Sequence, residues 1–136
     1  MKLSSIKVDS KLAEQGDWVD GIPDLPGIRI KARGTNNTDY RLLEAKLVRE
    51  IPRSQRIEGV LPADQDRIAG RLMLDTVVID VEGLENEDGV PIKYTRELGE
   101  KLLLDPDFRA FMAGAAYAGS VVAQRQKVDQ DTETKN

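Results

Sequence analysis

Hydrophobic and polar residues alternate with a period of two near the start of the chain. Between residues 28 and 33 apolar and basic positions follow one another in the order Ile28, Arg29, Ile30, Lys31, Ala32, Arg33. This alternation is typical of a half-buried strand with a basic outer face. Trp18 and Val19 precede it across a loop rich in Gly and Pro. Residues 17–34 therefore predict a hairpin-like unit in which Trp18 anchors the core.

A second strand is predicted in the middle of the chain, where residues 76–83 read TVVIDVEG. β-Branched residues favour strands, and the alternation places Val77, Ile79 and Val81 in the core. Asp80 and Glu82 then point to water. The turn ENEDG follows, and residues 90–95, VPIKYT, predict a short returning strand. Pro91 assigns that strand to the edge of the sheet because proline cannot donate to the ladder.

Helical periodicity appears in four other segments. Residues 38–51 place Tyr40, Leu43, Leu47 and Ile51 on one face, with Asn37 or Thr38 as the N-cap. Pro62 suits the first turn of a second helix, and Thr95 caps a third. The last and longest helix starts at Asp105-Pro106 and extends to residue 126. Its expected buried positions are Phe108, Phe111, Met112, Ala115 and Val122.

The order of these elements predicts a small α+β domain with a short antiparallel sheet and about four helices, the longest at the C-terminus. The length of 136 residues fits one domain. We assign residues 1–126 to this domain and residues 127–136, which are polar, to a C-terminal tail.

The composition limits the chemistry. The chain has no Cys and no His, which excludes disulfides, thiolate metal sites and any nucleophile activated by an imidazole. We expect no enzyme activity, no metal and no cofactor. No apolar segment is long enough for a signal peptide or a membrane span, so the expected location is the cytoplasm.

The net charge of −4 is unevenly distributed. Residues 29–56 carry eight Lys and Arg against three acids, whereas residues 75–88 carry six acids and no base. Two opposed patches can bind copies of the same chain head to tail. Alternatively, they are ordinary solvated faces that pair within the monomer. The residues assigned to self-association are Arg29, Lys31, Arg33, Asp80, Glu82, Glu85, Glu87 and Asp88.

The acidic stretch does not have the register of a calcium loop, since Val90 and Pro91 follow Gly89 where a closing acid would stand. Asp80 and Glu82 could share one strand face as a general acid and base, but strand alternation accounts for both without chemistry. The basic strand and helix could contact nucleic acid. However, aromatic residues do not interleave with the bases as a single-strand platform requires, so nucleic-acid binding is not expected.

Small residues recur along the last helix. Small side chains let another helix approach closely, either inside the domain or from a partner. The domain has few elements to cover so long a helix, so we expect part of this face to bind a partner. The residues assigned to it are Ala110, Gly114, Ala118 and Val122.

Several stretches together resemble the tail assembly chaperones of long-tailed bacteriophages, a family that includes the lambda tail chaperone. The resemblance begins with GDWVDGIPDLPGIRIKARG and the helix TDYRLLEAKLVREI. Its most specific part is LMLDTVVIDVEGLENEDGVPIKYTRELGEKLLLDPDFRAFM, residues 72–112. There a strand ends in an acidic turn with Asp-Gly, and a later helix leads into a Leu-Leu-x-Asp-Pro-x-Phe step.

The resemblance implies a non-enzymatic role in the cytoplasm of the bacterial host. Such chaperones bind the tape measure protein before the tail tube forms around it and are absent from the finished particle. They self-associate, and many also have a frameshifted, extended form. Two alternatives share the small size: a structural virion protein, such as a head-tail connector or minor tail component, and a nucleic-acid-binding phage regulator.

Overall fold

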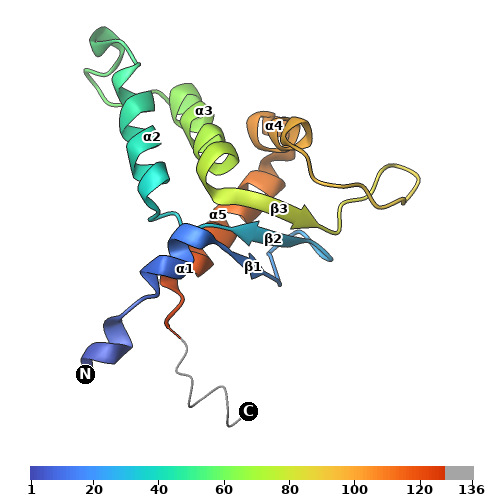
Figure 1. Cartoon of the computed structure of the whole chain (residues 1–136). Coiled ribbons are helices and arrows are strands. Elements are labelled where there is room, and N and C mark those ends of the chain that lie inside the picture. Colours follow the sequence, from blue (N-terminus) through green and yellow to red (C-terminus); the bar gives the residue numbers. More distant parts are fainter. Residues whose placement is uncertain (128–136) are drawn as a thin grey trace.

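The computed structural model describes residues 1–127, which contain a three-stranded antiparallel sheet and five α-helices (Figure 1). In chain order these are α1 (Ser10–Gln15), β1 (Asp17–Val19), β2 (Arg29–Ala32), α2 (Thr38–Arg49), α3 (Pro62–Leu72), β3 (Val78–Glu82), α4 (Arg96–Leu104) and α5 (Arg109–Gln124). The short turns are η1 (Leu3–Ile6), η2 (Arg53–Gln55), the π-helical turn η3 (Met73–Val77) and η4 (Pro106–Phe108). The α+β prediction is confirmed, and α5, with 16 residues, is the longest helix. The predicted polar tail lies outside the described residues, except for Lys127.

The sheet has the order β1-β2-β3, and the predicted hairpin forms its first two strands. Val19 pairs with Ile30, and Ile30 pairs with Val81. These three side chains are buried on the face that α5 covers (Figure 1). The core therefore lies between one face of a small sheet and one long helix.

The predicted alternation of the middle strand is wrong at its start. Lys31 pairs with Asp80, but the next residue of β2, Ala32, pairs with Val78, so β3 has a β-bulge at Ile79. Within β3 the buried residues are consequently Val78 and Val81, and Ile79 is 41% exposed on the outer face. Val77, just before the strand, is buried as predicted. Asp80 and Glu82 face outward as predicted, although Asp80 is half-buried.

Trp18 does not anchor the core. It pairs in register with Lys31, so it lies on the outer face of the sheet and is only half-buried. The Arg29 guanidinium lies 4.9 Å from the centre of its ring, a cation–π arrangement. The predicted returning strand at residues 90–95 is also reduced, to one isolated bridge between Glu85 and Pro91.

Helices α2 and α3 pack side by side away from the sheet and have a small core of their own (Figure 1). Leu47 of α2 and Ile51, just after its end, pack with Ile68 and Leu72 of α3. The predicted apolar stripe of α2 is thus confirmed. Pro62 starts α3 as predicted.

Asn37 joins this helix pair to the main body and is fully buried. Its side-chain oxygen accepts from the Tyr40 backbone N–H at 2.7 Å and so caps α2. Its side-chain nitrogen donates to the carbonyl oxygens of Gly34 and Thr76, each at 2.8 Å. Thr76 belongs to η3, and its hydroxyl donates to the Leu72 carbonyl at 2.6 Å. One amide therefore links the loop after β2, the start of α2 and the turn that leads into β3.

Replacing Asn37 by Asp tests this link, because it keeps the capping oxygen and the shape but turns the donor into an acceptor that faces two carbonyl oxygens. We expect the free energy of unfolding to fall by about 2–4 kcal/mol, since buried polar groups lose their partners and a charge is buried. Urea unfolding followed by circular dichroism measures it. The neighbouring, exposed Asn36→Asp should stay within about 0.5 kcal/mol of wild type. Equal stability of the two variants would show that the amide is not a critical link.

Candidate partner-binding site

The small-residue face of α5 lies mostly inside the chain. Gly114, Ala118 and Val122, three of the four residues assigned to partner binding, are buried, whereas Ala110 is exposed. A Cβ atom at Gly114 would overlap the Leu25 side chain and come within 2.9 Å of Ile22. The close approach that the small residues permit is therefore made to the loop between β1 and β2 and to the sheet.

The two charged patches also meet in part within the chain. Arg29 donates to Asp20 at 2.6 Å and to Glu82 at 2.8 Å, and the hydrogen bond to Asp20 raises the pKa of Arg29. Arg33 pairs with Glu14 and Asp39. Two of the three basic residues assigned to self-association are thus occupied by neighbouring acids.

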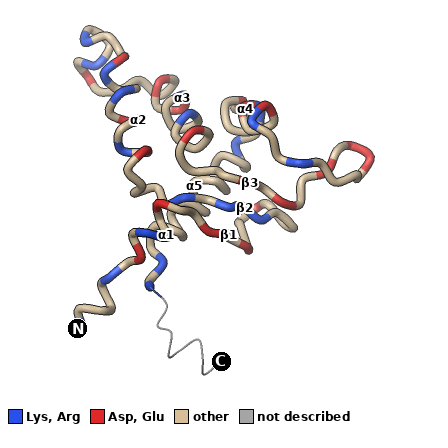
Figure 2. Tube along the Cα trace, viewed as in Figure 1, with Lys and Arg blue, Asp and Glu red and all other residues tan. Residues whose placement is uncertain are grey.

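The other assigned charges separate into two groups. Lys31 lies opposite Asp80 in the sheet register, and both are half-buried. Glu85, Glu87 and Asp88 instead lie together in the loop that projects beyond β3 (Figure 2). Within residues 1–127, no group of three or more acids is arranged to hold a metal ion. The structure thus brings the three loop acids together on a surface and separates them from the basic strand.

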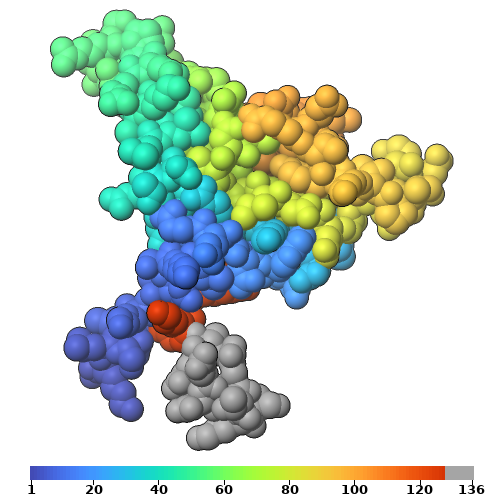
Figure 3. Space-filling view, in the orientation of Figure 1, coloured from blue at the N-terminus to red at the C-terminus, as the bar shows by residue number. Residues whose placement is uncertain are grey.

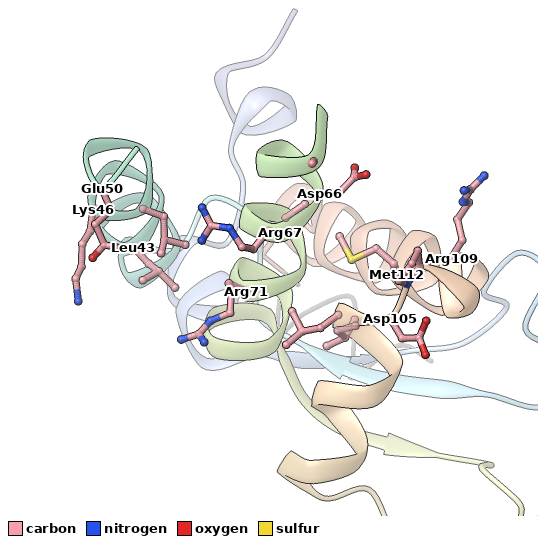
Figure 4. Close-up of a pocket in the computed structure, with 15 residues that line it drawn as sticks. Leu43, Lys46, Glu50, Asp66, Arg67, Arg71, Asp105, Arg109 and Met112 are labelled. Atoms are coloured by element: carbon pink, nitrogen blue, oxygen red, sulfur yellow. The ribbon is translucent and has the colours of Figure 1, made fainter. Parts of the chain in front are cut away.

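A surface groove of about 900 Å³ crosses α3, a site that the sequence analysis did not anticipate (Figure 4). Helix α2 forms one side, and the corner from α4 through η4 to α5 forms the other. The apolar residues that line it include Leu43, Leu47, Ala69, Leu103, Leu104 and Met112. Charged side chains also line the groove: Lys46, Glu50, Asp66, Arg67, Arg71, Asp105 and Arg109.

Two local features fix the shape of the groove. Gly70 lets α4 approach α3, because a Cβ atom there would lie 2.5 Å from the Leu103 carbonyl oxygen and 2.9 Å from Leu104. Asp75, just after α3, accepts from Arg71 at 3.0 Å and from Arg96 of α4 at 2.7 Å. The hydrogen bond to Asp75 raises the pKa of Arg96. Helices α3 and α4 are thereby held together at Gly70, where they come close, and at Asp75, just after the end of α3.

A groove that combines apolar side chains with charges of both signs can accept an amphipathic helix, whose apolar stripe would pack against the apolar residues. The sequence held no clear signal for this site, because its lining residues come from separate helical segments. Which helices would frame α3 depends on the tertiary packing, so the groove could not be located from periodicity.

None of the helices within residues 1–127 combines the length and the apolar character needed to span a membrane.

The fold and the groove define a small α+β domain whose candidate site is a helix-lined surface groove. The family of the YdaY prophage protein matches residues 35–136, about three quarters of the chain. The chain therefore belongs to the YdaY prophage protein family and is phage-derived. No curated protein and no solved structure shows a significant match to it.

Gly114→Leu tests the internal role of the small-residue face. Because the larger side chain must displace Leu25 and Ile22, we expect the free energy of unfolding to fall by at least about 2 kcal/mol. The matched control is Ala113→Leu, one residue away and exposed, which should change it by no more than about 0.5 kcal/mol. Thermal unfolding of the two variants gives the comparison. A Gly114→Leu protein as stable as wild type would mean that this face tolerates large side chains and is free to meet a partner.

Proposed function

We propose that this prophage protein is a tail assembly chaperone that binds a helical segment of the tape measure protein in the groove across α3. The observation that carries the proposal is the groove itself, in which apolar side chains of α2 and of the α4–α5 corner lie on either side of α3. The groove-lining residues of the corner from α4 through η4 to α5 lie within residues 72–112, the stretch with the most specific resemblance to tail chaperones. Membership of a prophage family agrees with this role.

The mechanism is mass action. A long helical protein without its tube exposes apolar stripes that would associate with one another. A chaperone that covers such a stripe lowers the concentration of free, aggregation-prone chain by an amount set by its own concentration and affinity. Such a role needs no catalytic group. It places the protein in the cytoplasm of the bacterial host and outside the finished particle.

The groove suits a partner helix because some of its apolar side chains are still partly exposed. Leu104 is 41% exposed and Leu43 and Met112 are half-buried, so each can lose further apolar area to a partner. The charges that line the groove give the partner helix polar contacts along both flanks, and these fix its register more than its affinity.

The test is to co-express the full chain with the tape measure gene of the same prophage and to measure the affinity of the purified pair. Leu104→Glu should weaken the complex at least tenfold, because burying a Leu contributes about 1.5–3 kcal/mol and each 1.4 kcal/mol is about tenfold in affinity. Tyr117→Glu is the matched control, since Tyr117 is 39% exposed on α5 and does not line the groove. It should bind as wild type does.

Two results would contradict the proposal. If wild type and the tape measure protein form no complex, the chaperone role is wrong. If the complex forms but Leu104→Glu binds equally well, the groove is not the site. Detection of the protein in purified particles would favour a structural virion protein instead.

A further inference from the structure

Residues 84–92 form a projecting loop, here called the acidic arm, that is rigid for its size. The Asn86 side chain accepts from the backbone N–H groups of Asp88 and Val90 at 2.9 and 3.0 Å. Backbone bonds from Asn86 to Val90 and from Ile92 to Leu84, each 2.9 Å, close it at both ends. At its base, Gly83 has φ +97° and lies against the Gly27 carbonyl, where no side chain would fit. The arm is therefore preorganised, which lowers the entropy cost of binding.

The arm offers acidic and apolar groups that residues 1–127 leave exposed. Its three acids, Glu85, Glu87 and Asp88, are exposed, and none of the ion pairs among residues 1–127 includes them. Val90 is 54% exposed beside them. Figure 3 shows the arm extending away from the rest of the molecule. A preorganised loop with exposed charge and apolar surface has the properties of a contact element.

The complementary surface is the outer side of α2, here called the basic face. It consists of Leu42, Ala45, Lys46 and Arg49, with Arg53 just beyond the helix end, all exposed. The helical spacing of these residues puts them on one side, and the exposed Glu50, next to Lys46, lies at its border. Leu42 is 65% exposed. None of the three basic residues takes part in an ion pair within the described part of the chain.

We propose that the acidic arm of one copy binds the basic face of α2 on a second copy, so that the protein associates head to tail. The two surfaces match in charge and both carry exposed apolar side chains. They lie at opposite ends of the molecule, with α2 on one side and the arm on the other (Figures 1 and 2). One copy's own arm therefore does not reach its own basic face. A contact between two different surfaces is heterologous and repeats into a ring or a filament.

The basic surface that binds the acidic arm is therefore α2 and not strand β2. Arg29 and Arg33 are occupied by Asp20, Glu82, Glu14 and Asp39, whereas Arg49 and Arg53 remain available. Lys46 also lines the groove, but neither Arg49 nor Arg53 does, so changing these two arginines tests self-association separately from binding of the tape measure protein.

A charge swap tests it by sedimentation velocity of the full chain. Wild type at tens of micromolar should exceed the monomer mass at 0.1 M salt and approach it at 1 M, because the screening length falls from about 10 Å to about 3 Å. Glu85→Lys with Glu87→Lys, and separately Arg49→Glu with Arg53→Glu, should each weaken association at least about tenfold by opposing like charges. An equimolar mixture of the two variants should regain assembly, because each reversed surface meets a complementary one.

Lys7→Glu with Lys11→Glu, on exposed residues of the N-terminal region, serves as the matched control and should assemble as wild type does. Circular dichroism of each variant checks that the fold is intact. The proposal is wrong if wild type is monomeric at 0.1 M salt or if either reversed variant assembles normally. It is equally wrong if the mixture stays monomeric.

Discussion

The close approach of α5 to the sheet is the contact on which the rest of this fold depends. The sheet has only three short strands, and α5 covers the face that carries its buried residues. Ala115, Ala118 and Val122 are fully buried against that face. At Gly119 the approach is close enough for its carbonyl oxygen to accept from the Thr35 backbone N–H at 3.2 Å. Because the helix sits so near, a few aliphatic side chains suffice to close the core.

The position of α5 in turn determines where the surfaces lie. Its first turns carry Arg109 and Met112 to the groove, while its last turns contact the loop after β2. Asn37 holds that same loop to α2 and to η3. The helix pair α2–α3 is thereby fixed at one side of the body, and the acidic arm leaves β3 at the other (Figure 1). The groove and the arm are thus consequences of one packing arrangement, and they lie on two different parts of the surface.

Local signals were sufficient for most of the elements. Asn37 and Thr95 cap the helices that they were predicted to cap, because a short polar side chain before a helix satisfies free backbone N–H groups. Asp105, predicted to start the last helix, caps only the short turn η4, and α5 begins at Arg109. The failures have a common cause. The bulge at Ile79 and the outward position of Trp18 depend on strand register, which is set by partners distant in the sequence. The alternation of residues within one strand does not reveal a bulge, because a bulge is an extra residue relative to the paired strand.

The sequence by itself determined the fold class, the long C-terminal helix with its small-residue face, the absence of Cys and His, and the two opposed charge patches. Only the tertiary structure decided which groups those residues contact. It placed Gly114 against the chain's own loop and paired Arg29 and Arg33 with nearby acids, whereas no ion pair among the described residues includes Glu87 or Arg49. The physical reason is that composition and spacing fix which face an element presents. Whether that face is buried, paired or exposed depends on distances between segments far apart in the chain.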